Sequence, residues 1–430
     1  MDDSHQPPLV VIGAGIVGVC AASYLQRDGH HVVLIDPGEP GMGASFGNGA
    51  CLFPSSIVPM SMPGTAMSVP RYLLDPDGPL SIRLRYLPRL APWLLRFARA
   101  GTPERAQAAA RALRALLRDV QECYAPLTHA AGAEDLVQRR GYLIVYETDA
   151  AFAADAGGNA LREQNGIAIE EVPPARIREM EPDLAPIYAR GRLIQEAGHT
   201  TNPHRLVQKL CEAFVKCGGR IVHEAVTGFD DNGSAVTAVR TQTNRRAASH
   251  VVLAAGAWSK PLAAQLGDSV PLESERGYHA MIARPERAPS IPVMSGEGKF
   301  IAIALETGIR FAGQVELASL GAPPNWDRAR ILLRLGMRMF PGLGVKDLEE
   351  RQTLWMGHRP STPDSLPVIG LSSRFANAVY AFGHGHVGMC AAPATGRIVT
   401  ALVGGRAPHI DIAPFSPTRF VSWRAHGARC

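Results

Sequence analysis

The first strong apolar pattern of the chain covers residues 9–12, where four hydrophobic residues in a row predict a short buried strand. Three of the next six residues are glycines, and residues 19–28 then show the mixed pattern of a helix that Gly29 ends. Residues 31–36 form a second apolar run that closes on Asp36. We therefore predict a strand, a glycine turn, a helix and a second strand within about 30 residues.

Beyond this unit the patterns predict helices and strands that alternate irregularly. Helices are expected over most of 71–120, and at 151–164, 174–181, 203–217 and 327–339, with a last one ending near 403. Strands are expected at 141–146, 221–229, 235–243, 249–255, 278–283, 300–316 and 377–382. Residues 37–70 are rich in Gly, Pro, Ser and Met, which is typical of irregular loops around a site.

Length and composition limit the classes of protein to consider. A chain of 430 residues exceeds the usual size of one hydrophobic core, so we expect two domains. Hydrophobic residues make up 46% and charged residues 19%, as in ordinary globular proteins. The net charge of +5 is small, and no zinc-finger, RNA-recognition or long basic motif is present, so nucleic acid is not an expected partner. The scattered cysteines show no paired spacing, which favours free thiols.

The glycine turn carries the clearest chemical signal. Gly13, Gly15 and Gly18 follow the GxGxxG pattern, in which the glycines allow a tight turn, close approach of a pyrophosphate, and close packing of helix on strand. The helix that follows presents free N–H groups and a positive dipole end to phosphates. Asp36, eighteen residues after Gly18, stands where a carboxylate can accept hydrogen bonds from a ribose. We predict a dinucleotide site here, and the motif alone does not separate FAD from NAD.

Six further motifs extend the picture along the chain. In order, the seven segments are VVIGAGIVG, ASFGNGA, LAAGAWS, ERGYH, IRFAGQVE, GHRPSTPDSLPVIG and GHGHVGM. Together they resemble the D-amino-acid oxidase-like (DAO) family of FAD-dependent oxidoreductases, and within it the bacterial D-amino-acid dehydrogenases. The resemblance extends from about residue 9 to about residue 420.

The resemblance implies an α/β fold, α+β overall, in which a glutathione-reductase-like FAD-binding Rossmann domain is interleaved with a smaller antiparallel-sheet substrate domain. We expect residues 1–65, 195–272 and 350–430 in the FAD-binding domain, and residues 66–194 and 273–349 in the substrate-binding domain. The cofactor is expected to be FAD, bound non-covalently. We assign these residues to its site: Gly13, Gly15, Ile16, Val17, Gly18, Asp36, Ser45, Asn48, Ala50, Val226, Ala255, Gly256, Trp258, His386, Val387 and Gly388.

Arginines are the candidates for binding a substrate carboxylate, because the planar guanidinium can bind both carboxylate oxygens. Arg310 and Arg359 occupy motif positions where related amine oxidases hold this carboxylate. Arg276, Tyr278 and His279 in ERGYH are nearby alternatives. The histidines show no persuasive metal spacing, so no metal site is expected.

These assignments lead to one expected reaction and several alternatives. We expect oxidative deamination of a small amino acid, most simply a D-amino acid. A hydride passes from Cα to flavin N5, and the imino acid product hydrolyses to a 2-oxo acid and ammonia. One alternative substrate is a cyclic or N-substituted amino acid such as D-proline, hydroxy-D-proline, sarcosine or an opine. A flavin-carrying electron-relay subunit of a larger complex is the alternative from another class, and an NAD-dependent dehydrogenase is the third.

The expected electron acceptor is a quinone or another respiratory acceptor. The polar N-terminal residues resemble no signal peptide, so a cytoplasmic protein is expected. Residues 82–99 mix arginines with Trp93, Phe97 and several leucines, and two interpretations of this segment stay open. It forms either a helix that packs on the substrate domain or a peripheral contact with the inner face of the cell membrane. We expect Pro88 and Pro92 to interrupt a regular helix in this segment. The oligomeric state stays open.

Overall fold

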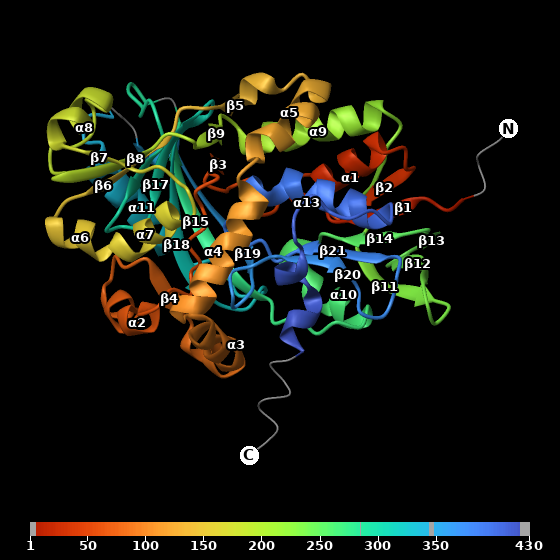
Figure 1. The fold of residues 1–430 in the computed structure, drawn as a ribbon. Coiled ribbons are helices and arrows are strands. Elements are labelled where there is room, and N and C mark those ends of the chain that lie inside the picture. Colours follow the sequence, from red (N-terminus) through yellow and green to blue (C-terminus); the bar gives the residue numbers. More distant parts are fainter. Residues whose placement is uncertain (1–5, 284, 344–347, 422–430) are drawn as a thin grey trace, which may run out of the picture.

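The computed structural model describes residues 6–283, 285–343 and 348–421. Its first layer is a six-stranded sheet in which five neighbouring strands are parallel and the last is antiparallel (Figure 1). The strand order is β10 (Arg220–Val222), β2 (Val32–Ile35), β1 (Leu9–Ile12), β14 (Val251–Leu253), β21 (Ala378–Phe382) and β20 (Val368–Leu371). Strands from both ends of the chain thus belong to one sheet, with β14 between β1 and β21.

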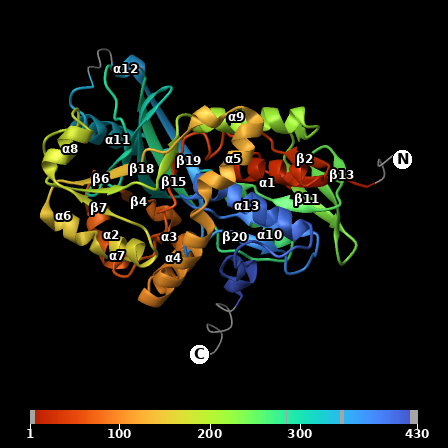
Figure 2. The same cartoon turned by 45° about the horizontal axis from the view of Figure 1, so that its top comes forward.

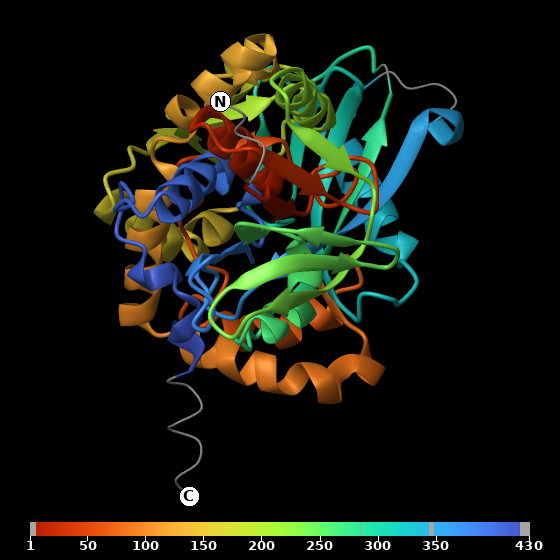
Figure 3. The same cartoon turned by 90° about the vertical axis from the view of Figure 1, so that its right-hand side faces the viewer.

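This sheet is covered on both faces, which explains why its strands are continuous apolar runs. Val11, Leu34 and Val379 belong to the core under the helices α1 (Ile16–Arg27), α13 (Gly388–Val403) and α9 (Pro203–Lys216). Val10 and Val33 belong to the core on the other face. That face is covered by the antiparallel strands β11 (Val226–Asp231), β12 (Val236–Thr241) and β13 (Arg245–Ala247) with the helix α10 (Ser259–Gln265), as Figure 3 shows.

The second layer is a larger, mostly antiparallel sheet. Its path runs through β19 (Gln352–Ser361), β15 (Glu273–Ile282), β18 (Gly308–Leu317), β17 (Ile301–Leu305), β16 (Val293–Ser295), β6 (Tyr142–Tyr146), β8 (Arg190–Ile194) and β7 (Glu170–Val172). The short strand β4 (Leu80–Ile82) pairs with β18, and the helix α11 (Trp326–Met339) packs against β15 and β18. The predicted combination of a nucleotide-binding sheet and an antiparallel sheet is confirmed.

A small sheet, labelled in Figure 1, and further helices, seen in Figure 2, complete the molecule. The small sheet contains β3 (Cys51–Leu52), β9 (Gly198–Thr200) and β5 (Val137–Gln138). The remaining helices are α2 (Thr65–Leu74), α3 (Leu87–Ala100), α4 (Pro103–Leu117), α5 (Val120–Ala131), α6 (Asp149–Ala154), α7 (Ala156–Gln164), α8 (Pro174–Met180) and α12 (Leu348–Arg351). Within the described residues, we find no helix with the length and hydropathy needed to span a bilayer. The described cysteines, which exclude Cys430, are free thiols.

Two helix predictions differ from the structure. The predicted helix 151–164 is two helices separated at Asp155, whose carboxylate accepts a hydrogen bond from the Tyr146 hydroxyl. Gly157 and Gly158, which are poor helix formers, follow the break. Pro92 does not interrupt α3, which continues through it. Pro92 and Pro88 both face solvent, so water can satisfy the carbonyl that loses its helical partner.

The predicted domain ranges, which stay a prediction, differ from the sheet and helix packing at two places. Strand β19 lies in the range assigned to FAD binding, yet it pairs along its whole length with β15 of the second sheet. Helices α4 and α5 lie in the range assigned to the substrate domain, yet they pack against α13. Ser361 at the end of β19 also forms a bridge to His384, so one strand joins both layers.

Candidate active site

A cavity of about 860 Å³ lies where the carboxyl ends of the parallel strands meet the second sheet. Its lining comes from the glycine turn after β1, the loop 37–49, the start of α10, the strands β15 and β19, and the start of α13. Pockets at the carboxyl ends of strands are the usual ligand sites of open α/β sheets. Elements of both layers are thus needed to form it.

Each of the three glycines of the first turn is required for a different structural reason. Gly13 has φ +106°, and a Cβ there would lie 2.4 Å from the carbonyl oxygen of Ala254. A Cβ on Gly18 would lie 1.8 Å from the Gly13 oxygen, so Gly18 is required where helix and turn pack. A Cβ on Gly15 would meet only the Ser45 hydroxyl, at 3.5 Å. Gly15 therefore leaves space in front of the helix N-terminus, where a pyrophosphate would bind.

Two side chains hold this turn in place. The carboxylate of Asp36 accepts a hydrogen bond from the Ala14 amide at 2.8 Å and from the Gly38 amide at 2.9 Å. The Ser45 hydroxyl accepts one from the Ile16 amide at 2.9 Å. Asp36 and Ser45 also line the cavity, so both can contact a bound dinucleotide. The predicted contact between Asp36 and a ribose stays a prediction.

Arg310 stabilises the loop after Ser45 by hydrogen bonds to its backbone. Asn48 closes a tight turn, in which its side-chain oxygen accepts from the Ala50 amide at 2.6 Å, and Ala50 has φ +56°. Arg310 Nη1 donates to the carbonyls of Phe46 at 3.2 Å and Asn48 at 2.8 Å. Burial lowers the pKa of Arg310 to about 10, so it keeps its charge at neutral pH. Arg310 does not line the cavity, which differs from its predicted place against the substrate.

The start of α13 closes the other side of the cavity. Gly385 has φ +52°, and the turn brings His386 and Gly388 into the cavity lining. Desolvation, with a further contribution from Arg359, lowers the pKa of His386. His384 also belongs to the lining, is buried, and has its Nε2 3.0 Å from the Thr395 hydroxyl. Neutral histidines and free amides therefore face this part of the cavity.

Most residues assigned to FAD converge on this cavity. Those in its lining are Gly13, Gly15, Ile16, Val17, Asp36, Ser45, Asn48, Val226, Ala255, Gly256, Trp258, His386 and Gly388. Gly18, Ala50 and Val387 lie behind the lining and support its turns. The glycine cradle, the helix N-terminus and the size of the cavity fit an elongated dinucleotide such as FAD.

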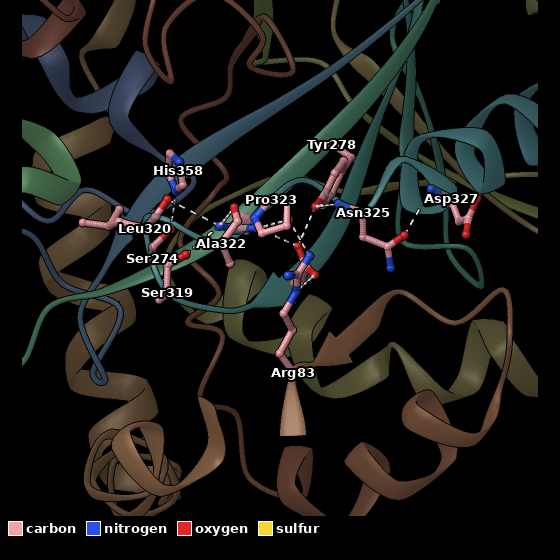
Figure 4. A network of polar contacts seen from close by, with 12 residues as sticks. Arg83, Ser274, Tyr278, Ser319, Leu320, Ala322, Pro323, Asn325, Asp327 and His358 are labelled. Atoms are coloured by element: carbon pink, nitrogen blue, oxygen red, sulfur yellow. Dashed lines mark hydrogen bonds and ion pairs between the residues drawn. The ribbon is translucent and has the colours of Figure 1, made fainter. Parts of the chain in front are cut away.

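The strand alternation of β15 separates the ERGYH residues into two groups. Arg276 and Tyr278 do not line the cavity, and both side chains donate to the carboxylate of Glu316. Figure 4 shows the polar network around them, with Tyr278 and Arg83 labelled. Arg276 also donates to four backbone carbonyls. The acceptors are Ser319, Leu320, Ala322 and Pro323. The structure therefore gives both predicted site residues a supporting position rather than a place at the substrate.

His279 and Arg359 lie on the cavity side of the same strands. The Nδ1 atom of His279 lies 3.0 Å from the Gly47 carbonyl, and its ring stacks behind Trp355. Arg359 Nη1 donates to the Gln314 carbonyl at 2.8 Å, while the side chain stays in the cavity lining. Arg359 lines the cavity, whereas the other four catalytic candidates lie outside its lining.

Sequence reasoning missed Trp355, which forms a wall of the cavity. A partial signal was present, because Trp355, Gly357 and Arg359 lie on one face of β19, although His358 and Pro360 also line the cavity. Once Arg359 is a candidate, the same alternation selects Trp355. Lys299 and Phe300, which also line the cavity, follow from no motif.

Comparison with known proteins identifies the family of this chain. The family model described as "FAD dependent oxidoreductase" (DAO) matches residues 8–402. A D-amino-acid oxidase of Bradyrhizobium diazoefficiens is 43% identical over 96% of this chain and 99% of its own. A D-amino acid dehydrogenase of Paramagnetospirillum magneticum is 30% identical over 96% of this chain and 99% of its own.

Solved structures share the fold at lower identity. Glycine oxidase from Geobacillus kaustophilus has a TM-score of 0.72 and 21% identity, covering 97% of this chain and 99% of its own. L-proline dehydrogenase from P. horikoshii has a TM-score of 0.72 and 19% identity, covering 97% of this chain and 98% of its own. The glycine cradle, the two sheets and the match to the family model lead to one conclusion. This chain belongs to the DAO family of FAD-dependent oxidoreductases.

Proposed function

We propose that this enzyme oxidises D-amino acids, with Arg359 as the residue that binds the substrate carboxylate. The observation that carries the proposal is the position of Arg359 in the lining of a cavity that also contains the glycine cradle. Two relatives over nearly the whole chain are named D-amino-acid oxidase and D-amino acid dehydrogenase, which supports the substrate class.

The contacts of Arg359 suit a carboxylate clamp. Nη1 and Nη2 donate to the carbonyls of Gln314 and Gly313, at 2.8 and 3.2 Å, which fixes the plane of the guanidinium. A guanidinium has five N–H donors, so others stay available to the cavity. Burial lowers the pKa of Arg359, and the carboxyl of Glu275 opposes this shift. A fixed, permanently charged fork is the group that a carboxylate binds best.

FAD, when bound, supplies the acceptor for the hydride that leaves the substrate Cα. The protein then has to position the substrate rather than move a proton at Cα. This fits the cavity, because burial keeps the nearby His279 and His384 neutral, with pKa values lowered to about 3. The amino acid loses two electrons and becomes an imino acid, which water hydrolyses to a 2-oxo acid and ammonia.

The stereochemistry follows from two fixed points, the guanidinium and the cofactor. With the carboxylate held and the Cα–H directed at the acceptor, inversion at Cα would force the side chain into the place of the amine. Misplacement of a reacting atom can cost about 100-fold in rate. These two points select one enantiomer, and the two relatives named for D-amino acids support the D form, so we propose D-specificity. A cyclic or N-substituted amino acid is the alternative substrate, because the argument fixes the carboxylate and the Cα–H but not the substituents of the amine.

The electron-relay alternative finds less support. A relay subunit needs no substrate pocket, whereas here a cavity of about 860 Å³ has an arginine in its lining. An enzyme that binds its own substrate is the simpler explanation of that arrangement.

We further propose a quinone as the electron acceptor and a peripheral contact with an anionic membrane through α3. This helix buries Leu90 and Trp93, yet its other side exposes Leu84 at the entry to the helix, Leu87 and Leu95, at 81, 39 and 53% of their surface. The exposed arginines of this segment, Arg85, Arg89 and Arg99, flank the leucines. A helix that is apolar on its exposed side and basic at its edges suits a surface of anionic lipid.

Anaerobic reduction of bound flavin by a panel of D- and L-amino acids tests the substrate proposal. Stopped-flow absorbance should show bleaching by D-amino acids and much slower bleaching by the L-enantiomers. Faster reduction by L-amino acids would overturn the stereochemistry. Reoxidation by a soluble quinone should outpace reoxidation by oxygen, and rapid peroxide formation in air would contradict the acceptor proposal.

A further inference from the structure

The cavity side of β15 and β19 presents a regular arrangement of side chains. Three successive cross-strand pairs occupy it: Glu275 with Arg359, Gly277 with Gly357, and His279 with Trp355. A charged pair and an aromatic pair are thus separated by a pair of glycines. Because side chains of a strand alternate between faces, the three pairs lie on one face of the sheet.

The two glycines are required by the side chains that lie over them. A Cβ on Gly277 would lie 2.3 Å from Arg359 Nη2, and a Cβ on Gly357 would lie 1.9 Å from the indole of Trp355. A Cβ on Gly47, in the loop above, would lie 2.2 Å from the same indole. The guanidinium and the indole therefore approach each other over a floor of bare backbone. Arg359, Trp355 and both glycines of this floor line the cavity.

The indole is held as a fixed wall. It stacks on His279 with the ring centroids 5.1 Å apart and the planes at 16°, and it packs at an angle against Phe46 at 6.4 Å. His279 is in turn bound to the Gly47 carbonyl through Nδ1. Burial and the neighbouring Arg310 lower the pKa of His279 to about 3. The stack therefore carries no charge at neutral pH.

We infer that Trp355 is a wall of the pocket for the substrate side chain, and that the site favours D-amino acids with apolar or aromatic side chains. The inference rests on the proposed function, because it assumes the carboxylate on Arg359. Four further residues at this end of the cavity are apolar: Met294, Phe300, Ile301 and Ala312. A side chain that leaves water for this wall gains free energy by burial and by ring contacts.

Charged side chains gain less at this end. Arg359 in the lining and Arg310 behind it are both cationic, so a lysine-like or arginine-like side chain would be repelled. Lys299 also lines the cavity, and its ammonium lies 3.6 Å from the carboxylate of Asp155. If these cations bound the substrate side chain instead of Trp355, the site would favour D-glutamate. D-Glutamate is therefore included in the test.

The test compares side chains in the wild type and in Trp355→Ala. In the wild type, kcat/KM should be higher for D-phenylalanine than for D-glutamate or D-lysine. Trp355→Ala should lower kcat/KM by about tenfold or more for D-phenylalanine, and by less than about threefold for D-alanine. Trp355→Phe should recover most of the loss. Trp326→Ala is the matched control, since Trp326 begins α11 and does not line the cavity.

A binding measurement provides a readout without turnover. Calorimetry should show that the wild-type holoenzyme binds 3-phenylpropionate more tightly than propionate, and that Trp355→Ala abolishes the difference. Equal losses for large and small ligands would overturn the inference and assign Trp355 a structural role. A wild-type preference for D-glutamate would also overturn it. If no D-amino acid reduces the flavin, the proposed function fails. The binding of 3-phenylpropionate and propionate would still test the role of Trp355, because it requires no turnover.

Discussion

Nη1 of Arg276 lies 3.3 Å from Oε2 of Glu316, and the two side chains expose 0 and 2% of their surface. Glu316 also accepts a hydrogen bond from Tyr278 at 2.5 Å and one from Arg83 at 2.8 Å. These hydrogen bonds and the two arginines lower the pKa of Glu316, although burial opposes the shift. The carboxylate therefore holds the loop before α11 and the segment before α3 to the same strand.

Replacement of Glu316 should destabilise the fold and leave the chemistry intact. Glu316→Ala would strand the buried guanidinium of Arg276, which typically costs about 3–5 kcal/mol. Denaturant unfolding followed by circular dichroism should show this loss. The flavin reduction rate should be unchanged, because Glu316 faces away from the cavity. Glu306→Ala, which removes an exposed ion pair with Arg205, should cost at most about 1 kcal/mol. A lower reduction rate in folded Glu316→Ala would contradict the assignment.

Gly15→Val should yield a folded protein that lacks flavin. The nearest heavy atom to the new Cβ is the Ser45 hydroxyl at 3.5 Å, so the protein tolerates the side chain. The added methyl groups would fill the space in front of the α1 N-terminus, where the pyrophosphate binds. Flavin absorbance per mole of protein, with far-ultraviolet circular dichroism, measures both effects. Gly157→Val on the exposed side of α7 is the control, and normal flavin content in Gly15→Val would refute the cradle.

Arg359→Leu should cost about 2–4 kcal/mol of transition-state stabilisation, as expected for a lost charge-assisted contact. The flavin should remain bound, because the glycine cradle is untouched. Arg359→Lys should recover only part of the activity, since an ammonium cannot replace the planar fork. Stopped-flow flavin reduction at varied substrate concentration gives the limiting reduction rate and the apparent Kd of the substrate, and steady-state assays give kcat/KM. An unchanged kcat/KM in Arg359→Leu would exclude it as the carboxylate clamp.

The buried histidines should make the protein less stable in acid. Burial lowers the pKa of His279 and of His384 to about 3, whereas the unfolded value is near 6.5. Between these pH values the unfolded chain binds more protons than the folded one, so stability rises with pH across this window. Each histidine contributes up to about 1.4 kcal/mol per pH unit. His384→Gln should flatten the slope of unfolding free energy between pH 4 and pH 6.5. An identical slope would disprove the contribution.

Substitution of the exposed leucines of α3 should release the protein from membranes. Leu84→Ser with Leu95→Ser should abolish sedimentation with vesicles that contain phosphatidylglycerol, because burial of apolar surface drives such binding. Added salt should weaken binding of the wild type, since its arginines contribute through charge. Ile187→Ser with Leu371→Ser is the control, as both residues are exposed elsewhere on the molecule. Unchanged binding of the α3 variant would reject this surface.

Local pattern was sufficient where an element is formed by neighbours in the chain. The unit of β1, α1 and β2 follows from apolar runs, the glycine turn and Asp36, all within 30 residues. The break at Asp155 has a local signal that the predicted helix 151–164 ignored, because Gly157 and Gly158 follow it and glycine is a poor helix former. The break coincides with a hydrogen bond from Tyr146, which lies on a buried strand.

The sequence also does not determine which face of the sheet a strand residue lies on. Period two separates Arg276 and Tyr278 from Gly277 and His279, but it leaves open which group faces the cavity. That choice depends on α11 and Glu316, which cover one face of the sheet. Arg310 shows the same limit, since its motif position is known while its partners lie more than 250 residues away, in the loop at Phe46.

The order of strands in the parallel sheet determines when this protein can acquire its cofactor during synthesis. The strand β1 lies between β2 and β14, and β14 in turn needs β21 as its other neighbour. Helix α13 must also dock on α1, where Gly396 approaches the Cys20 carbonyl so closely that a Cβ would lie at 2.9 Å. The elements that complete the cavity around the glycine turn thus include β21 and α13, which lie near the end of the chain. We therefore expect FAD capture to follow the folding of β21 and α13, the last elements of the site to be made.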